Sequence, residues 1–492
     1  MPGFVLLTTG DIGKAVRGAV RRIMHRAVMF GAIMTASLTT TLGAQSPPPV
    51  EAVVTTADRT RLLATLPVSR APDTTAWTVE VDTMLRYQSM TGFGAALTDA
   101  SVSLLNALPR AARDALVREL FSPTRGVGFS MLRIPIGASD FSTSHTTLAD
   151  SASYATDGTP MRLNLLGESA RLALLRDIRR QQPALTVMAT PWSAPAWMKT
   201  PASLYGGTLR DDAMPHFAHY LARVVAAFDS AGVPIDLLSV QNEPQHAPPD
   251  YPGMRLSPAQ RATLVGRHLG PALARLPHAP QLLEWDHNWD APEEPLAVLA
   301  DSAARGYVHG VAWHCYAGDV SAQSRVQAAF PSMATYFTEC AGGAWAPDFG
   351  DNLLWNSKTL IVGATRHWAR GVMLWNVALD ATGGPHKGGC ANCRGVVTID
   401  ARTARVTRNE EYYALAHASR FVARGAVRVE SRLTGATAAE AAGVTHVAFV
   451  HPDGAVTVIV VNEHRRAVRL TVARATVTAP PRSVVTVVVR AQ

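Results

Sequence analysis

The chain has 492 residues, of which 47% are hydrophobic and 17% charged, so it can build a large core and shows no compositional sign of disorder. Its length fits one large domain with a smaller one, and its four cysteines exclude a scaffold built on disulfides. The formal net charge is +8, and half of it lies in residues 1–44, which leaves 41 basic and 37 acidic side chains in the remainder. Without a basic–aromatic motif, this mild excess does not favour a nucleic-acid partner.

The first 44 residues have the pattern of an N-terminal signal peptide. A basic segment that ends at Arg26 precedes a short apolar run over Ala27–Leu38, and small residues up to Ala44 offer a cleavage site. The run is shorter than the roughly 20 residues that a membrane-spanning helix needs, so a retained anchor is only the alternative interpretation. Met24 is an alternative start, and residues 45–50 are predicted to be a linker. The sequence therefore predicts export to the periplasm or the cell exterior.

Strand-like sequence fills residues 51–87, and from residue 88 to about 410 short apolar runs alternate with amphipathic helical patterns. Helical spacing of apolar residues covers Asn164–Arg180, Met214–Phe228 and Asp351–Ala369. Apolar runs separated by helices are typical of a parallel sheet that is buried on both faces. The eight runs are Gly92–Ala96, Gly128–Ile134, Thr186–Thr190, Leu237–Gln241, Gln281–Trp285, Val308–Trp313, Ala334–Phe337 and Gly371–Trp375.

Eight such units predict an α/β fold with a (β/α)8 barrel over residues 88–410. The rival is an open, doubly wound sheet, and it is weakened because no G-x-G-x-x-G follows the first run. Residues 411–492 are predicted to hold a last helix and an antiparallel β-domain, with Asp453-Gly454 as a hairpin turn. We expect residues 51–87 to pair with this domain. Its runs are Val427–Leu433, Val444–Val450, Val456–Asn462, Val468–Val472 and Val484–Arg490.

Two carboxylates follow apolar runs at what a barrel would make one rim. Glu243 comes just after the fourth run and Glu339 just after the seventh, and functional residues of barrels gather at these strand ends. Asn242 can hold a hydroxyl, and aromatic rings stack on the apolar faces of sugars. The rings expected at the rim are Trp192, Trp197, His314, Tyr316 and Trp375. The set indicates sugar chemistry, although a solvated glutamate or a core-filling ring is the alternative for each residue taken alone.

The sequence resembles glycoside hydrolase family 30, the glucosylceramidase family, from about residue 91 to beyond residue 460. The resemblance implies a TIM barrel with an appended antiparallel β-sandwich, to which the N-terminal strand segment contributes. It rests on stretches that occur in the family's order and at compatible spacings. They are MTGFGAALTDA (90–100), MLRIPIGASDFS (131–142), TPWSAPAWMKT (190–200), VQNEP (240–244), YVHGVAWHCY (307–316), FTEC (337–340), WNVAL (375–379) and VAFVHPDGAVTVIVVNE (447–463).

The resemblance also implies a role for each matching residue. Glu243 falls at the position of the general acid/base, and Glu339 at that of the nucleophile. Arg133 matches an arginine that supports the carboxylates, and His314 is expected beside it. Asn242 matches the residue that hydrogen-bonds the 2-hydroxyl. The other matches to sugar-binding residues are Asp140, Trp192, Tyr316 and Trp375.

The activity implied is that of an exported retaining hydrolase of β-D-glucosidic bonds, of glucosylceramidase type, which uses two carboxylates and neither cofactor nor metal. The alternative within the family is an endo-β-1,6-glucanase, or another β-glycosidase, so that the substrate is a β-glucoside, a glycolipid or a β-glucan. A carbohydrate-binding protein without chemistry is disfavoured because both glutamates are present. Two departures bear on the aglycone: Leu374 stands where the family has an aspartate, and the loop over residues 383–395 resembles bacterial members more than the animal lysosomal enzyme.

The cysteines form two pairs of different kinds. Cys390 and Cys393 lie in a glycine-rich loop of an exported chain, so a local disulfide is predicted, with a zinc site as the alternative. Cys315 and Cys340 follow the sixth and seventh runs, and we expect them to be buried neighbours without a catalytic role.

Overall fold

The structure is a computed structural model that describes residues 49–71, 73–149, 162–473 and 475–491. The predicted signal over residues 1–44 lies outside the described residues. Among the helices that the structure describes, none is both long enough and apolar enough to span a bilayer.

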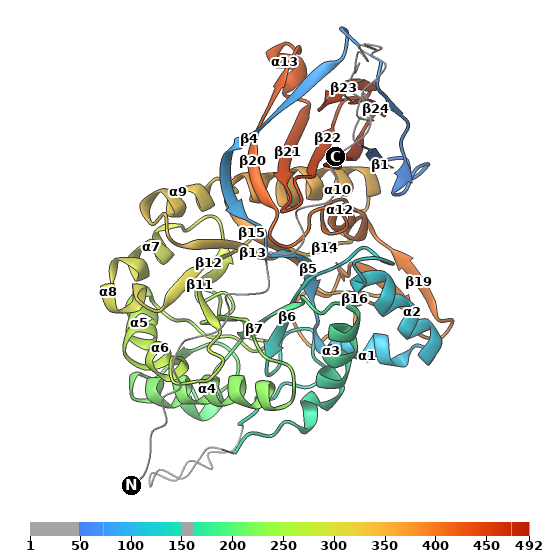
Figure 1. Cartoon of the computed structure of the whole chain (residues 1–492). Coiled ribbons are helices and arrows are strands. Elements are labelled where there is room, and N and C mark those ends of the chain that lie inside the picture. Colours follow the sequence, from blue (N-terminus) through green and yellow to red (C-terminus); the bar gives the residue numbers. More distant parts are fainter. Residues whose placement is uncertain (1–48, 72, 150–161, 474, 492) are drawn as a thin grey trace, which may run out of the picture. The chain divides into compact units, whose positions relative to one another are not determined.

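Eight parallel strands close into a barrel in chain order, which confirms the predicted fold class (Figure 1). Their central positions are buried on both faces, because helices cover the outside and side chains fill the inside. The filling comes from a layer of one or two residues on each of seven strands, among them Met131, Met188 and Leu283. The barrel strands are β5 (Gly92–Ala96), β6 (Met131–Ile136), β7 (Thr186–Pro191), β10 (Leu237–Ser239), β11 (Gln281–Asn288), β12 (Val308–His314), β13 (Ala334–Glu339) and β15 (Ala369–Leu374).

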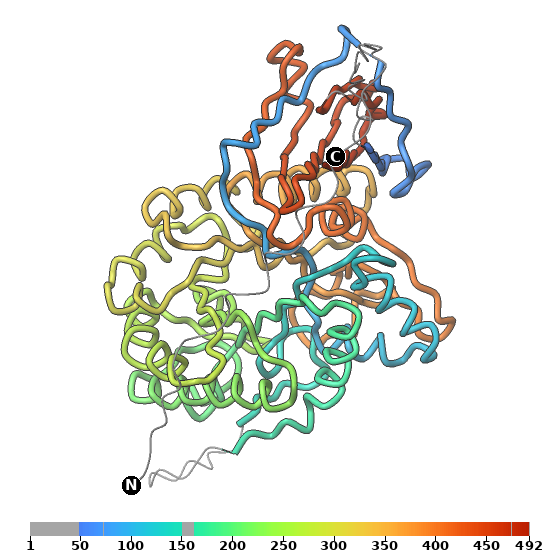
Figure 2. Tube along the Cα trace, in the orientation of Figure 1, coloured from blue at the N-terminus to red at the C-terminus, as the bar shows by residue number. Residues whose placement is uncertain are grey.

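Helices alternate with the barrel strands along the chain. Figure 2 shows the chain passing around the barrel as its colour changes from blue through green to yellow. The helix expected over residues 351–369 is interrupted by a π-helical segment, Asn356–Gly363, and ends before β15. The α-helices of the barrel are α1 (Asp99–Ala107), α2 (Arg110–Phe121), α3 (Ser169–Gln181), α4 (Met214–Ser230), α5 (Pro258–Thr263), α6 (Gly270–Leu273), α7 (Glu293–Ala300), α8 (Ser302–Arg305), α9 (Ala322–Ala329), α10 (Phe349–Trp355) and α11 (Ala364–Arg366).

Short strands in the loops after the barrel strands shape the mouth of the barrel. One of these pairs fixes the loops that follow β13 and β15, because the backbone at Gly342 and Gly343 pairs with Arg394 and Cys393. The short strands are β8 (Lys199–Thr200), β9 (Thr208–Leu209), β14 (Gly342–Gly343), β16 (Ala378–Leu379), β17 (Cys393–Arg394), β18 (Val397–Asp400) and β19 (Arg405–Arg408).

A ten-stranded sheet with its own apolar core combines the two ends of the described chain. β1 pairs antiparallel with β25, and β4 pairs antiparallel with β20, so blue strands lie beside orange and red ones in Figure 1. The central strands of the sheet are rich in Val and Thr and are buried at nearly every position. Alternate residues explain this, because Val458 and Val460 belong to the core of the sheet itself, whereas Ile459 and Val461 belong to the main core. The strands are β1 (Val50–Thr56), β2 (Ala64–Thr65), β3 (Val68–Ser69), β4 (Trp77–Ser89), β20 (Val427–Thr434), β21 (Val444–Val450), β22 (Val456–Asn462), β23 (Val468–Val472), β24 (Ala475–Ala479) and β25 (Ser483–Val489), with the short helix α13 (Ala438–Ala441) between β20 and β21.

Helix α12 (Glu410–Ser419) packs against both barrel strand β5 and sheet strand β25. Its His417 is fully buried, with Nδ1 2.8 Å from Thr486 Oγ1 and Nε2 2.9 Å from Thr55 Oγ1. The Thr486 hydroxyl donates to the His417 carbonyl, so its oxygen accepts a hydrogen bond from Nδ1–H. A neutral imidazole therefore satisfies every partner. We call these three residues the seam.

Candidate active site

Glu243 is held by a backbone conformation that favours glycine. Its φ is +49°, and its backbone N–H donates to the carbonyl of Asp286 at 3.0 Å. A non-glycine residue in the left-handed region costs free energy, and surrounding contacts must hold it there. The strained turn after β10 aims the side chain across the barrel, where Oε1 lies 3.0 Å from His314 Nδ1 and 3.5 Å from His287 Nδ1.

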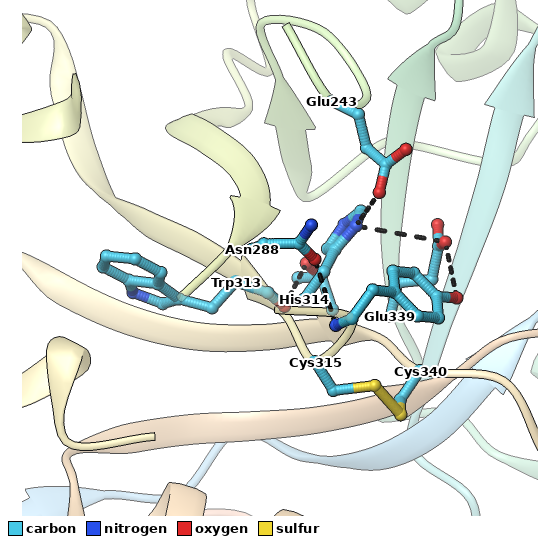
Figure 3. The surroundings of a disulfide bond; sticks show 9 residues. Glu243, Asn288, Trp313, His314, Cys315, Glu339 and Cys340 are labelled. Carbon is cyan, nitrogen blue, oxygen red and sulfur yellow. Dashed lines mark hydrogen bonds and ion pairs between the residues drawn. A yellow bond between two sulfur atoms is a disulfide. The ribbon is translucent and has the colours of Figure 1, made fainter. Parts of the chain in front are cut away.

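Glu339 is the last residue of β13 and lies on the opposite side of the mouth (Figure 3). Arg133 on β6 donates from Nη1 to Oε2 at 2.5 Å, and the Tyr316 hydroxyl donates to Oε1 at 2.9 Å. Both donors fix the orientation of this carboxyl group. Its side chain is only 8% exposed, so these contacts are weakly screened by solvent.

Asp286, at the end of β11, joins the two carboxylates through buried partners. Its side chain accepts from Arg133 Nη2 at 2.8 Å, from His314 Nε2 at 3.1 Å and from the Thr338 hydroxyl at 2.6 Å. Arg133 and Asp286 are completely buried, and such a pair is stable only when its remaining donors and acceptors find partners. We call Arg133, Glu243, Asp286, His314 and Glu339 the mouth cluster.

His314 carries a proton on both ring nitrogens, because each nitrogen faces a carboxylate and only an imidazolium donates to both. Burial lowers its pKa, but the charge of Glu339 and the hydrogen bonds to Asp286 and Glu243 outweigh burial and raise that pKa to about 9. Burial raises the pKa of Glu243, yet hydrogen bonds from His287 and His314 outweigh it and hold that pKa well below its usual range. In the free protein, the one proton between His314 Nδ1 and Glu243 Oε1 therefore lies on the histidine.

The two carboxylates converge. His314 Nδ1 lies 3.0 Å from Glu243 Oε1 and 3.9 Å from Glu339 Oε1, so these oxygens are no more than 6.9 Å apart. Retaining glycosidases place the two carboxyl groups about 5–5.5 Å apart, and inverting ones about 6.5–9.5 Å. The upper bound on this pair of oxygens is compatible with the retaining spacing.

An inner pocket of about 330 Å³ lies over the two carboxylates. Trp192 and Trp375 stack with ring centroids 5.2 Å apart, and Arg133 lies 4.8 Å from the centroid of Trp192. Besides the two glutamates, the pocket is lined by Asp140, Trp192, Asn242, Tyr251, Tyr316, Ala341, Trp345, Trp375, Gly389, Cys390 and Cys393.

Asp140 is a neutral acid at pH 7. Burial, together with the charge of Glu339, raises its pKa to about 8, although backbone hydrogen bonds from Phe141 and Cys390 lower it in part. A protonated carboxyl donates as well as accepts, which suits a sugar hydroxyl. Asn242 accepts from Arg133 Nη2 through Oδ1 at 2.7 Å, which leaves its amide N–H groups for a ligand.

Two family models match consecutive parts of the chain. The glycosyl hydrolase family 30 TIM-barrel domain matches residues 90–422, and the family 30 beta sandwich domain matches residues 425–487. The chain belongs to glycosyl hydrolase family 30. It is a retaining O-glycosyl hydrolase, as predicted from the resemblance.

Relatives in family 30 differ in their named activities. An endo-1,6-β-D-glucanase of Neurospora crassa is 36% identical over 388 residues, which cover 76% of this chain and 79% of the relative. The lysosomal acid glucosylceramidase of Mus musculus is 28% identical over 420 residues, 79% of this chain and 77% of the relative. A solved endo-β1,6-glucanase superposes with a TM-score of 0.83 at 29% identity, over 91% of this chain and all of that one.

The structure brings most of the predicted site residues of this family 30 chain together. Asp140, Trp192, Asn242, Tyr316 and Trp375 line the inner pocket with the two glutamates, and Arg133 and His314 lie beneath it. Trp197 does not line the pocket, because its indole N–H donates to the carbonyl of Ala149 at 2.9 Å. Leu374 is buried in the main apolar core.

Asp286, His287 and Tyr251 belong to the site and were not predicted. The fifth predicted run ends at Trp285, and the two polar residues that follow it repeat the signal that marks Glu243 and Glu339. In the structure both lie inside β11, which extends to Asn288. Tyr251 carries no such signal, since it lies in a loop that only the fold brings to the pocket.

Both cysteine pairs are disulfides in the structure. Cys390–Cys393 closes the loop that lines the inner pocket. Cys315 and Cys340 are neighbours, as expected, although only Cys340 is fully buried. The bond between them was not predicted, and their Cα atoms lie 5.4 Å apart. Cys315 follows His314 and Cys340 follows Glu339, so this bond ties the ends of β12 and β13 directly below the mouth cluster (Figure 3).

Glu243, His287 and His314 also have donor atoms within 4.8 Å of one another, as a transition-metal site requires. A metal there would compete with the proton between His314 and Glu243 and with the hydrogen bond from His314 to Asp286. The chemistry of this donor set therefore fits proton transfer better than metal binding.

Proposed function

We propose that this chain is an exported endo-β-1,6-glucanase that works by double displacement, with Glu339 as nucleophile and Glu243 as general acid/base. The single observation that carries the mechanism is the convergence of two carboxyl groups over one pocket. One accepts hydrogen bonds from Arg133 and Tyr316, and the other is hydrogen-bonded to a cationic histidine.

In the first step, a Glu339 oxygen bonds to the anomeric carbon while the bond from that carbon to the leaving oxygen breaks. The leaving oxygen takes the proton that His314 and Glu243 share, delivered through Glu243 Oε1. Glu339 loses its charge as the ester forms, and this charge is the main cause that raises the pKa of His314. The pKa of His314 therefore falls during this step. His314 therefore gives up its proton during the same step in which the bond to the leaving oxygen breaks.

In the second step, water attacks the anomeric carbon of the glycosyl ester and gives a proton to Glu243. Glu339 regains its charge as the ester breaks, and His314 regains its high affinity for a proton. Both displacements invert the anomeric carbon, so the first sugar released has the β configuration of the substrate.

Several residues are assigned to the sugar in the pocket. Asp140 donates to a hydroxyl as a neutral acid, Asn242 donates to the 2-hydroxyl, and Trp192 and Trp375 form the apolar wall. These assignments follow the family resemblance and are supported by the positions of all four residues around the inner pocket.

A β-1,6-glucan is favoured over glucosylceramide as substrate. The glucanase relatives are 33–36% identical to this chain, whereas the glucosylceramidase relatives are 26–28% identical. The surface beside the pocket also carries Asp348, Asp351 and Asn352, which suit hydroxyl groups better than an acyl chain. Export is supported by the signal-like N-terminal pattern and by two disulfides, which persist in oxidising compartments.

The test uses the purified protein with a linear β-1,6-glucan, a β-1,3-glucan, and glucosylceramide in detergent micelles. We expect rapid release of short β-1,6-linked oligosaccharides and a rate on glucosylceramide that is at least about tenfold lower. Preferential cleavage of glucosylceramide would restore the glucosylceramidase hypothesis, and cleavage of the β-1,3-glucan alone would overturn both.

A further inference from the structure

A second, larger cavity opens beside the inner pocket. This outer cavity has a volume of about 690 Å³, within the range of about 300–1,000 Å³ that is usual for ligand sites. It shares Tyr316, Ala341 and Trp345 with the inner pocket, so the two are continuous. The disulfide Cys315–Cys340 and residues of α10 form its other walls.

Exposed aromatic rings gather in this cavity. Among the described residues, only four Tyr, Trp or Phe side chains are 40% or more exposed, and three of them line the outer cavity: Tyr316 at 46%, Trp345 at 55% and Trp355 at 45%. Exposed rings that cluster in one hollow indicate a binding site, because water contact with such rings is unfavourable. Several flat rings in a cavity beside the pocket suit the apolar faces of sugars.

Polar groups line the same cavity as these rings. Asn356 is 94% buried, and its amide nitrogen has no acceptor within the described part of the chain. Asn352 is held in place because its amide nitrogen donates to the carbonyls of Ala346 and Asp348. Asp348 and Asp351 add carboxylate oxygens to the same wall. Aromatic platforms with fixed polar neighbours are typical of oligosaccharide binding rather than of lipid binding.

Two residues that line the inner pocket, Gly389 and Asp140, pack closely against each other. Gly389, at φ +64°, packs so closely on Asp140 that a Cβ at this glycine would lie 2.4 Å from the Asp140 Cβ. The disulfide Cys390–Cys393 holds this loop closed. A chain bound at the carboxylates therefore has most of its room past Tyr316 and Trp345, in the outer cavity.

We propose that the outer cavity binds the leaving part of the substrate, as two or more glucosyl units of a β-1,6-linked chain stacked on Trp345 and Trp355. The inference rests on the proposed β-1,6-glucanase function and adds where the chain lies. Of the three exposed rings, Trp355 alone lines the outer cavity without lining the inner pocket, so a substitution there tests the outer cavity separately.

The test compares the β-1,6-linked tetramer of glucose with the corresponding dimer, each labelled with ¹⁸O at the reducing end. For the wild type, kcat/KM on the tetramer should exceed that on the dimer at least tenfold, and the labelled product should hold two or three glucose units. Trp355→Ala should lower the tetramer-to-dimer ratio about tenfold and move the label toward single glucose. Trp355→Phe keeps a ring and should retain most of the ratio.

Tyr307→Ala is the matched control, since Tyr307 is the fourth exposed aromatic residue and lines neither cavity. It should leave the ratio unchanged. If the wild type cleaves both oligomers equally well, or if its labelled product is single glucose, the outer cavity does not bind the leaving chain although the glucanase function stands. If the wild type hydrolyses β-D-glucosyl fluoride but neither oligomer, the glucanase function itself fails, and the inference with it.

Discussion

Two fully buried histidines, one in the mouth cluster and one in the seam, have opposite protonation. His314 meets carboxylates at both ring nitrogens, which raise its pKa to about 9. His417 meets two threonine hydroxyls, and burial lowers its pKa to about 3. Burial is the same in both places, so the charge of the partners decides the outcome.

The difference separates two tasks within one chain. The mouth cluster holds buried charged side chains, although burying them has a desolvation cost. Its protons can be transferred during a reaction. The seam holds the barrel and the ten-stranded sheet together with neutral hydrogen bonds that need no charge. Substitutions in the mouth cluster should therefore change activity, and substitutions in the seam should change stability.

Glu339→Gln should have the largest effect. It removes the nucleophile and should lower kcat on every glucoside by about 10⁴-fold or more. It also removes the charge that most raises the pKa of His314, so the ring should titrate closer to neutral pH in NMR spectra. Glu463→Gln, in an ion pair with Lys358, is the control and should leave both unchanged. Near-normal turnover by the Glu339→Gln variant would contradict the assignment.

Loss of the disulfide Cys315–Cys340 should rank second. A double Cys→Ser variant should lose about 3 kcal/mol of unfolding free energy, because the bond closes a loop with a sequence separation of 25. The double variant at Cys390 and Cys393 should lose less, since that separation is 3. Urea unfolding measures both. Activity should fall in the first variant as well, because the bond fixes the residues next to His314 and Glu339. Equal losses of stability in the two variants would show that loop closure is not the cause.

His314→Gln should lower kcat about 10²-fold on substrates with poor leaving groups, the scale of general acid catalysis. The wild-type rate should decline as pH rises through about 9, because His314 loses its proton there, and this limb should disappear in the variant. His417→Gln is the matched control and should keep the wild-type pH profile. An unchanged alkaline limb in His314→Gln would show that another group carries the proton.

His417 in the seam should make the protein less stable as the pH falls. His417 stays neutral in the folded state and binds a proton below pH 6.5 in the unfolded state, so stability is complete above pH 6.5 and falls as pH drops toward 3. Through this one residue, the free energy of unfolding should fall by about 2 kcal/mol between pH 7 and pH 5. Urea unfolding at both pH values should show a smaller loss in His417→Gln. An equal loss in variant and wild type would assign the acid sensitivity to other groups.

Much of the barrel is readable from the sequence because buried parallel strands leave continuous apolar runs. Each of the eight predicted runs overlaps a barrel strand, and Gly92–Ala96 has the predicted bounds. The run predicted from Gly128 was three residues early, since the chain is not yet paired there and the strand begins at Met131. Strand Ala475–Ala479 was missed because it is short and lacks a run of large apolar residues.

The site was readable where a polar residue follows a strand and matches a family motif, as Glu243 and Glu339 do. The sequence does not reveal which buried charged side chains contact one another. The links from Asp286 to Arg133 and His314 join residues 153 and 28 positions apart, and the bond between Cys315 and Cys340 depends on the register of two neighbouring strands. The outer cavity likewise arises from loops that only the fold brings together.

The role of Glu339 as nucleophile is tested most directly by trapping the covalent intermediate. A 2-deoxy-2-fluoro-β-glucoside with a good leaving group should react once and stay attached, because the fluorine slows the second displacement more than the first. Mass spectrometry of the digested protein should find one fluoroglucosyl group, on the peptide that contains Glu339. A label on a different residue, or a first-formed product of α configuration from an ordinary β-glucoside, would contradict the double displacement at Glu339.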